Sequence, residues 1–514
     1  MRTLPDWCEP LPDAETMRQI DRWSIERRGV ASLELMERAG LELARVAASV
    51  VRDGAVLVII GKGNNGGDGL VAARILRDEG RQVRLVATAP LDEISGDAAV
   101  NLERLGGGRP LVLTAAGEHA AEFERAALII DALLGTGFQG EPRGAVAHAI
   151  DQINQAGCPV VSADVPSGVD ASTGVVAGNA VRAHATVTFH AAKPGLWVNP
   201  GKSHAGKVQV VDIGIPRGAP LQADIGLITS RVAERLPVRD AHATKFTSGH
   251  VVVAGGSRGL MGAPAITSLA AMRAGAGYVT ACVPGSQAHV IDVQLMEVMT
   301  RALDERDGAV TIEAVPVVLD ALERAGALAL GPGLGRSDGA FAFARGLARR
   351  SRAPAVIDAD ALNAHAALLD DLAQRGGDTV LTPHAGELAR LLELTSEQVE
   401  RERVEHVRRA SRSANAVVVL KGDDTLIADP EGRIAVSAGA SPGLATAGSG
   451  DALTGVIAAL LAKSLDAFTA ACAGVWLHAA AGRRAAAACG TAEGVIASDV
   501  VAQLPAARAG EGSR

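Results

Sequence analysis

The sequence has few aromatic residues and few cysteines. Aromatic residues make up 2% of the 514 residues, whereas 48% are hydrophobic. The core must therefore consist mainly of Ala, Val, Leu and Ile, whose small side chains favour close packing of helices on a sheet. The five cysteines are odd in number, widely scattered and never arranged as CxxC, which argues against a disulfide framework or a zinc site. This pattern favours a reducing, cytoplasmic location.

Long charged or apolar runs are also missing. The formal net charge is −8, from 50 Lys and Arg against 58 Asp and Glu, and no basic run is long enough to hold a polyanion. We therefore expect no nucleic-acid partner. Residues 1–15 contain Pro, Asp and Glu where a secretion signal needs an apolar stretch. The most apolar late segment, 467–481, is too short for a membrane span and predicts a buried helix.

The length and the apolar pattern predict two α/β domains. Residues 15–49 have apolar positions at helical spacing, which predicts one or two covering helices. Short β-rich runs then alternate with helical stretches, as in a parallel sheet flanked by helices. These runs lie at 55–60, 83–88, 127–131, 159–165, 185–190 and 207–215.

A cluster of Pro and Gly residues at 216–220 interrupts this rhythm, and a second α/β series follows it. We place the boundary between residues 222 and 223, which gives domains 1–222 and 223–514. The strands predicted for the second domain lie at 250–254, 278–283, 327–330, 355–358, 379–382 and 417–420.

The first glycine-rich motif, GKGNNGGDG at 61–69, follows an apolar run and precedes a helical pattern. Backbone N–H groups at such a helix start attract anions. The motif contains GxGxxG, but the next strand ends without the acidic residue that a dinucleotide-binding Rossmann site places there. Amide oxygens at Asn64 and Asn65 favour a cation beside a phosphate, and the alternative is a turn that caps a helix.

Two further strand ends carry acids. Asp131 closes one strand and precedes the loop GTGFQGE, and Asp164 closes the next and leads into VPSG. Ligands of open α/β sheets bind beyond the carboxyl ends of the strands, so we expect these loops to form one site. Lys193 follows another strand and could carry a proton or contact a phosphate, although a solvated loop lysine is an equal alternative.

Together, NNGGD, the Asp before the GTG loop and the DxPSG motif resemble the NAD(P)H-hydrate epimerase family over residues 13–215. The resemblance implies a Rossmann-like domain with a potassium ion on Asn65, Asp131 and Ser167. Asp164 would be the main acid or base, with Lys193 as a second proton carrier. The resemblance further implies that the hydrated dinucleotide contacts Asn64, Asn65, Gly66, Gly67, Asp68, Gly135, Thr136, Gly137, Phe138, Gln139, Gly140, Glu141 and Asp164.

The second glycine-rich motif, ATAGSGD at 445–451, places Asp451 beside glycine amides at the start of an apolar helix. The amides could bind an oxyanion while Asp451 takes a proton from a hydroxyl. An acid that only caps the helix is the simpler alternative. Five more motifs accompany this one in order, among them GPGLG at 331–335, TPHAGE at 382–387 and KGDDT at 421–425.

This set resembles the NAD(P)H-hydrate dehydratase family, with its ribokinase-like fold, over about 225–505. The resemblance implies that ADP binds at Lys421, Gly422, Asp423, Asp424, Thr425 and Gly450. Mg²⁺ would bridge the nucleotide phosphates, and Glu387 is a candidate ligand for it. The hydrated dinucleotide, NADHX or NADPHX, would contact Ala263, Gly333, His384 and Asp451. It also implies a homo-oligomer.

The hypothesis that unites both halves is repair of hydrated NADH and NADPH. The second domain would phosphorylate the hydroxyl of the S epimer, and loss of phosphate would restore the ring. The first domain would interconvert the R and S epimers. The alternatives are a ribokinase-like kinase of a small alcohol and a non-enzymatic nucleotide-sensing module in the first half.

Overall fold

The computed structural model describes residues 3–437 and 439–509 and divides into two compact units. The N-terminal unit comprises Pro10–Ile225, and the C-terminal unit comprises the residues up to Glu9 together with those from Gly226 onward. The boundary predicted between 222 and 223 lies close to Ile225. It does not anticipate that the segment before Pro10 belongs with the C-terminal unit. No helix in the described residues is long and apolar enough to cross a membrane.

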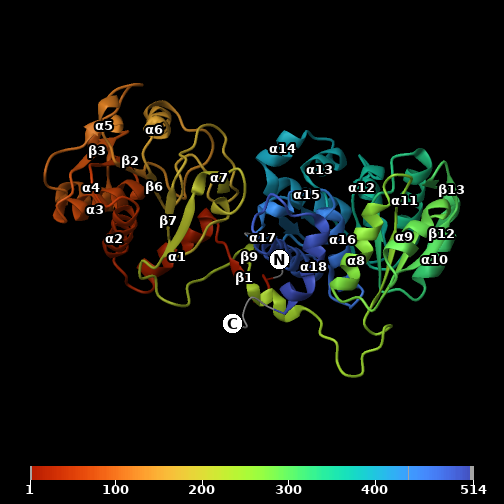
Figure 1. The fold of residues 1–514 in the computed structure, drawn as a ribbon. Helices are drawn as coiled ribbons and strands as arrows, with labels where there is room; N and C mark the ends of the chain where they lie inside the picture. The colour runs from red at the N-terminus through yellow and green to blue at the C-terminus, as the bar shows by residue number, and fades with distance from the viewer. Residues whose placement is uncertain (1–2, 438, 510–514) are drawn as a thin grey trace. The chain divides into compact units, whose positions relative to one another are not determined.

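A seven-stranded sheet in the order β4-β3-β2-β5-β6-β7-β8 organises the N-terminal unit, and its strand pairs are parallel (Figure 1). Its strands are β2 (Val56–Ile60), β3 (Val83–Ala87), β4 (Leu111–Val112), β5 (Leu128–Ala132), β6 (Val160–Ala163), β7 (Ala185–Phe189) and β8 (Lys207–Val211). Its helices are α1 (Ala14–Glu26), α2 (Ser32–Val50), α3 (Asn64–Asp78), α4 (Gly96–Arg104), α5 (Ala120–Glu124), α6 (Gly144–Gln155) and α7 (Lys202–Ala205), with 3₁₀ helices η1 (Leu91–Glu93) and η2 (Pro194–Leu196).

Both faces of this sheet are buried, which explains its almost uninterrupted apolar strands. Along β2, Val56, Val58 and Ile60 belong to one core cluster with residues of α1 to α4. The alternate residues Leu57 and Ile59 belong to a second cluster with residues of α5 and α6. The result is the expected three-layer arrangement of helices, sheet and helices.

The sheet reverses its strand order between β2 and β5, because β3 lies on one side of β2 and β5 on the other. Ligands of open α/β sheets bind at such a switch point, beyond the carboxyl ends of the strands. The NNGGD motif lies there, but as the first turns of α3 and not as a loop before the helix. Close packing demands glycine in this turn, since a Cβ on Gly66 would lie 2.1 Å from the carbonyl oxygen of Gly61.

The C-terminal unit contains an eleven-stranded sheet in the order β1-β9-β20-β19-β18-β17-β16-β15-β10-β11-β12. Its strands are β1 (Cys8–Pro10), β9 (Ile225–Ile228), β10 (His250–Ala254), β11 (Tyr278–Pro284), β12 (Met299–Leu303), β15 (Ala327–Leu330), β16 (Ala355–Ile357), β17 (Thr379–Leu381), β18 (Val417–Leu420), β19 (Leu426–Ala428) and β20 (Ile434–Val436). A separate two-stranded sheet pairs β13 (Glu305–Arg306) with β14 (Ala309–Val310). The strands from β18 through β10 to β12 run parallel, and β19 and β20, between β18 and β9, pair antiparallel to β18 and to each other.

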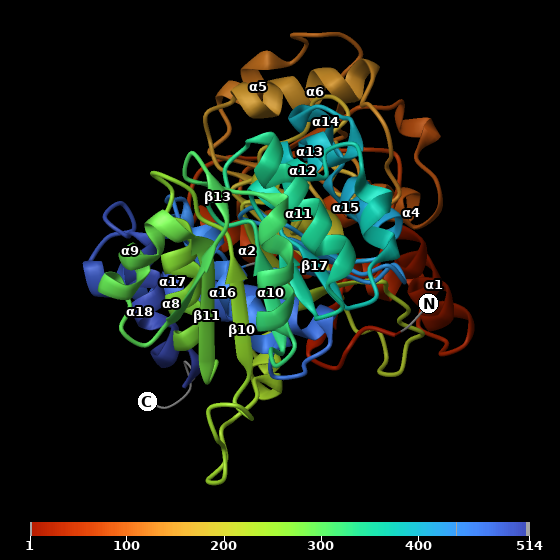
Figure 2. The same ribbon diagram turned by 90° about the vertical axis from the view of Figure 1, so that its right-hand side faces the viewer.

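Helices cover this sheet, as the view turned by 90° in Figure 2 shows for α10 and α11. Residues of α8, α16, α17 and α18 share one core cluster with β10, β11 and β15. The helices are α8 (Gly262–Arg273), α9 (Ala288–Gln294), α10 (Val315–Leu322), α11 (Asp338–Arg350), α12 (Asp360–Ala364), α13 (Ala385–Leu392), α14 (Ser396–Arg401), α15 (Arg403–Ala414), α16 (Ser449–Leu461), α17 (Ala467–Cys489) and α18 (Ala497–Arg508). The 3₁₀ helices are η3 (Ser230–Arg235), η4 (Gly285–Gln287), η5 (Ile312–Ala314), η6 (Leu369–Gln374) and η7 (Pro442–Leu444).

The N-terminal segment is anchored in the C-terminal unit by three kinds of contact. Thr229 Oγ1 donates a 2.7 Å hydrogen bond to the carbonyl oxygen of Trp7, 222 residues earlier in the chain. The Trp7 ring stacks on Phe468 with a centroid separation of 6.2 Å. Arg235 pairs with Asp6 at 2.8 Å on the surface. The N-terminal unit is thus inserted between β1 and β9 of the other unit.

Trp7 is 3% exposed, so its replacement should destabilise the C-terminal unit. We expect Trp7→Ala to lower the unfolding free energy of that unit by about 3–5 kcal/mol, the usual cost of truncating a buried aromatic side chain. Hydrogen–deuterium exchange read by mass spectrometry can assign the loss to peptides of either unit. Trp23→Ala on α1 is the control and should weaken the N-terminal unit instead. Faster exchange confined to residues 10–225 in Trp7→Ala would contradict this anchoring.

Candidate active sites

Asp131, at the carboxyl end of β5, organises the N-terminal site. Its fully buried carboxylate accepts hydrogen bonds from Ser167 Oγ at 2.6 Å, from Ser167 N at 2.9 Å and from Ser162 Oγ at 2.8 Å. Burial raises the pKa of Asp131 and the hydrogen bonds from Ser167 oppose that effect. These bonds fix the DxPSG segment against the end of β5.

Asn65 joins the same cluster from the first turn of α3. Its amide Nδ2 donates to the carbonyl oxygen of Leu134 at 2.9 Å, while Leu134 N donates to Ser167 Oγ at 2.9 Å. The Asn65 side chain is 8% exposed, and Gly135 packs directly against it. Amide, hydroxyl, carboxylate and carbonyl oxygens therefore gather here, and hard-oxygen donors of this kind suit a cation such as K⁺.

Asp164 and Lys193 form a buried ion pair. Lys193 Nζ donates to Asp164 Oδ1 at 2.6 Å, to Thr188 Oγ1 at 2.9 Å and to the carbonyl oxygen of Phe189 at 2.8 Å. Lys193 is completely buried, so the alternative of a solvated loop lysine is wrong. Asp164 has a backbone φ of +64°, a strained region for a non-glycine residue that is common at functional sites.

Two further carboxyl groups act on this pair electrostatically. Burial and the charges of Asp164 and Asp21 raise the pKa of Asp68 well above its usual value. Burial and the charge of Asp164, partly offset by Lys193, raise the pKa of Asp21 to about 6. Asp21 lies on the buried side of α1, next to Ile20 and between Met17 and Ser24. Asp21 was not among the predicted site residues, since helical periodicity shows only the apolar stripe.

The loop that follows Asp131 was predicted to contact the dinucleotide along its whole length. The structure brings its first residue, Gly135, against Asn65, whereas Gly137 and the later residues Gln139 and Gly140 are exposed. Glu141, at the end of the loop, lies against Gly178.

The charged carboxylate of Asp21 should lower the free energy of unfolding of the N-terminal unit at neutral pH. The native state retains a proton up to about pH 6 that the unfolded state releases near pH 4, so stability falls as the pH rises through this window. Asp21→Asn should therefore stabilise the N-terminal unit by about 1–2 kcal/mol at pH 7.5, after allowance for partial solvent exposure. The gain should shrink as the pH is lowered from 6 to 4. Calorimetry over this range tests it, with the exposed Glu26→Gln on the same helix as control.

In the C-terminal unit, the loops after β10 and β15 pack together at the point where the strand order reverses. Ser257 Oγ donates to the carbonyl oxygen of Gly333 at 2.9 Å, and Gly333 also packs against Leu260 and Ala263. The two predicted substrate contacts Ala263 and Gly333 are thus neighbours.

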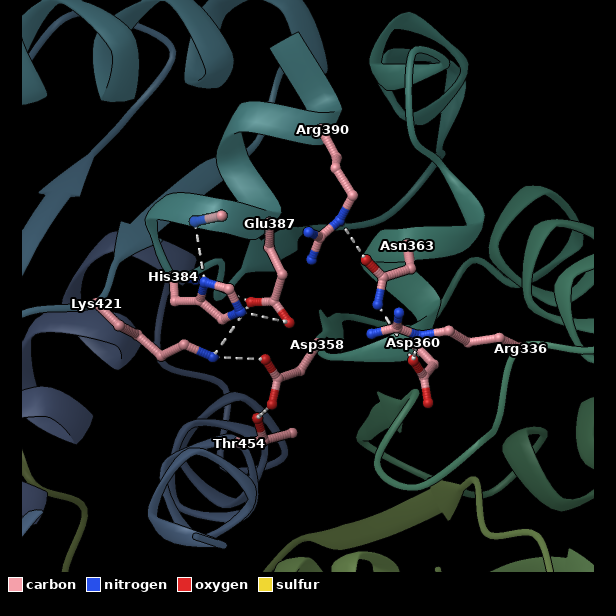
Figure 3. Close-up of polar contacts among 10 residues, drawn as sticks. Arg336, Asp358, Asp360, Asn363, His384, Glu387, Arg390, Lys421 and Thr454 are labelled. Carbon is pink, nitrogen blue, oxygen red and sulfur yellow. Dashed lines mark hydrogen bonds and ion pairs between the residues drawn. The ribbon is translucent and has the colours of Figure 1, made fainter. Parts of the chain in front are cut away.

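Lys421, at the end of β18, is the centre of a charged network at the carboxyl ends of three strands (Figure 3). Its Nζ donates to Asp358 Oδ1 at 3.0 Å and lies 3.7 Å from Glu387 Oε2. A Cβ on Gly450 would lie 3.5 Å from the same Nζ, so Lys421 reaches the start of α16. Burial opposes ionisation of Lys421, but the charges of Asp358 and Glu387 prevail and raise its pKa.

Asp451 is the third residue of α16, and Gly448 occupies the N-cap with φ +86°. Burial and the charge of Asp358, offset in part by Lys421, raise the pKa of Asp451 to about 7. A carboxyl group that titrates near neutral pH beside helix N-terminal amides can accept a proton from a bound hydroxyl.

Other predicted residues of this unit have structural partners. His384 caps α13, because its Nδ1 accepts from Gly386 N at 3.0 Å while Glu387 Oε2 accepts from His384 N at 2.9 Å. Asp424 is 1% exposed and pairs with the buried Arg403 at 3.1 Å, so its side chain anchors the KGDDT loop to the interior of the unit. Thr425 Oγ1 closes that loop by donating to the carbonyl oxygen of Gly422 at 2.7 Å.

Asp358 and Thr454 are missing from the predicted site, although Asp358 closes a predicted strand as Asp131 and Asp164 do. Asp360 was also missed, and its Oδ2 accepts from Gly335 N at 3.1 Å. An acid at the end of a central parallel strand was the available signal for Asp358.

The two sites define a two-domain α/β enzyme with polar clusters at the carboxyl ends of two parallel sheets. Residues 32–195 match the family model described as YjeF-related protein N-terminus, and residues 251–506 match the model described as NAD(P)H-hydrate dehydratase.

Curated relatives carry the same two halves. Bifunctional NAD(P)H-hydrate repair enzymes of Moorella thermoacetica and Salinibacter ruber are 40% and 38% identical, over 96% and 99% of this chain and 96% and 98% of theirs. That of Escherichia coli is 34% identical over 96% of this chain and 92% of its own. This chain belongs to the family of bifunctional NAD(P)H-hydrate repair enzymes.

A solved Bacillus subtilis structure is also similar to part of the chain. It is described as ADP/ATP-dependent NAD(P)H-hydrate dehydratase co-crystallised with ATP and Mg²⁺. It is 29% identical, with a TM-score of 0.46, and covers 54% of this chain and 94% of that chain.

Proposed function

We propose that the chain repairs hydrated NADH and NADPH, with epimerisation in the N-terminal unit and nucleotide-dependent dehydration of the S epimer in the C-terminal unit. The observation that carries the proposal is Asp451, whose carboxyl group lies at the start of α16 close to Lys421 and titrates near neutral pH. Membership of the repair-enzyme family supports the assignment of both units. A small-alcohol kinase would leave the N-terminal unit unexplained.

In the C-terminal unit, Asp451 takes the proton from the hydroxyl on the hydrated ring as that oxygen attacks the terminal phosphoryl group of ADP. Amides of Gly448 to Gly450 stabilise the charge on the transferred phosphoryl group, and Lys421 neutralises nucleotide phosphate. Phosphate then leaves with the C–O bond electrons, loss of the adjacent C–H proton restores the ring double bond, and AMP remains. Ala263, Gly333 and His384 would hold the dinucleotide so that only the S hydroxyl reaches Asp451.

In the N-terminal unit, Asp164 exchanges a proton with the hydroxyl oxygen while the C–N or C–O bond at the hydrated carbon breaks and forms again on the other face of the ring. Lys193 holds the Asp164 carboxylate in place through a contact of 2.6 Å between Nζ and Oδ1. The NNGGD turn of α3 would hold the pyrophosphate through its backbone N–H groups. Without this activity the R epimer would escape repair.

The proposal includes two ions, K⁺ and Mg²⁺, and different observations support each of them. Asn65, Asp131 and Ser167 supply oxygen atoms that would hold K⁺ beside the NNGGD turn. In the described part of the chain, no group of three His, Cys, Asp or Glu residues could hold a metal ion. Mg²⁺ would enter with the nucleotide, since it retains waters and binds through phosphates. A cytoplasmic location and a homo-oligomeric state complete the proposal.

Separate substitutions should separate the two activities. With pure S-NADHX, Mg²⁺ and ADP, Asp451→Asn should reduce the appearance of NADH absorbance by about 10²–10⁴-fold, because the proton acceptor is lost. With the R epimer, Asp164→Asn should abolish conversion above the enzyme-free rate and leave dehydration of the S epimer intact. Chromatography of both epimers measures this. Unchanged dehydration by Asp451→Asn with ADP and with ATP would refute the C-terminal assignment.

Potassium binding should be visible without an activity assay. If Asn65 holds K⁺, KCl should raise the melting midpoint of the N-terminal unit more than LiCl at equal ionic strength, because an ion that binds only the native state stabilises it. Asn65→Ala should remove that difference. Calorimetry of the whole chain measures it, with exposed Lys62→Ala as the neighbouring control. Equal midpoints in KCl and LiCl for the unmodified protein would count against the potassium site.

A further inference from the structure

Asp358 connects two parts of the C-terminal site that are far apart in the sequence. Its Oδ1 accepts from Lys421 Nζ at 3.0 Å, and its Oδ2 accepts from Thr454 Oγ1 at 2.8 Å. Figure 3 shows the carboxylate between these two side chains. Asp358 is 2% exposed and Thr454 is completely buried, so both bonds form away from solvent. Such bonds to a charged group hold their partners firmly.

Thr454 is the point where this contact reaches the catalytic helix. It lies one turn after Asp451 on α16, and residues three apart lie on the same side of a helix. A bond from Thr454 to the end of β16 therefore fixes how far α16 is rotated and how deep it lies. That position also decides where Asp451 and the amides at the helix start point.

The charge of Asp358 also reaches Asp451. After burial, Asp358 is the largest influence that raises the pKa of Asp451; Asp360 and Glu387 act in the same direction and Lys421 acts against them. Lys421 lies close to both Asp358 and Glu387, so its one positive charge offsets part of the charge of each. The pKa of Asp451 thus depends on how much of the negative charge of Asp358 is offset by Lys421.

We propose that Asp358 is a positioning residue for the dehydration reaction, which holds Lys421 at the nucleotide phosphates and α16 in register. Its charge also affects the pH at which Asp451 becomes a base. This proposal rests on the proposed function of Asp451 and deepens it. When nucleotide phosphates bind to Lys421, the lysine offsets less of the negative charge of Asp358. Asp451 then retains more readily the proton that it has accepted from the hydroxyl.

Two substitutions should have different signatures. Asp358→Asn removes the charge, so the acidic limb of kcat/KM for S-NADHX should move down by about one pH unit from its position near pH 7. The KM for ADP should rise, because Lys421 loses its main partner. Thr454→Val keeps the charge and removes only the bond to α16, so kcat should fall by roughly 3–10-fold at every pH while the limb stays in place.

The measurement is the pH profile of the full-length protein between pH 5.5 and 9, with S-NADHX, Mg²⁺ and ADP. Asp370→Asn removes an exposed carboxylate from the same unit and is the control for overall charge, since its profile should match the unmodified protein. Partial unfolding would scale the whole profile without moving the limb. A limb that stays in place in Asp358→Asn, or that moves equally in Asp370→Asn, overturns the proposal.

The role of Asp451 as the base and the role of Asp358 as a positioning residue can be refuted separately. If Asp451→Asn keeps its activity, the proposed base is wrong and the role of Asp358 falls with it. If Asp451→Asn is inactive but the limb stays in place in Asp358→Asn, only the role of Asp358 is wrong.

Discussion

Each unit depends on one lysine that is held by an aspartate at the end of a parallel strand, and Lys193 is fully buried while Lys421 is largely buried. Removing an ammonium group from water is costly unless carboxylates and hydrogen-bond acceptors surround it. Lys193 meets this requirement with Asp164, Thr188 and Phe189, and Lys421 meets it with Asp358 and Glu387. Because these partners come from different strands, the pairing only forms when the sheet is correctly assembled. Folding and the chemistry of each site are therefore coupled.

The scarcity of aromatic residues is matched by the way the helices pack. In the C-terminal unit, a Cβ on Gly455 of α16 would lie 2.2 Å from the carbonyl oxygen of Thr267 and 3.0 Å from Ala270. α8 and α16 can approach this closely only because small residues line their contact. The close approach holds α16, and with it Asp451, against the sheet. The alanine- and glycine-rich composition thus helps to fix the position of Asp451 in the site.

Much of both sheets could be predicted from the sequence because a parallel strand buried on both faces is an apolar run. β4, β9, β12, β19 and β20 were missed; β4, for example, has two residues, which are too few to show a periodicity. The pairing of β1 with the C-terminal sheet was also missed, because local patterns do not reveal which distant strand a short segment joins. Strand ends and helix starts were enough to select Asp131, Asp164 and Asp451. Asp21, which is coupled to Asp164, and Thr454, which bonds to Asp358, lie in helices, where nothing in the local sequence shows what they face.

The insertion of the N-terminal unit between β1 and β9 has a consequence for the order in which the protein is made. Synthesis proceeds from the N-terminus, and domains generally fold as they emerge. Trp7 is made before any residue of the N-terminal unit, but its partner Phe468 is made after all of them. The N-terminal unit can fold as soon as it has been made, whereas the opening segment meets its first partners, β9 and Thr229, only after the whole of that unit. The C-terminal unit therefore cannot form around its first strand until the N-terminal unit has been made.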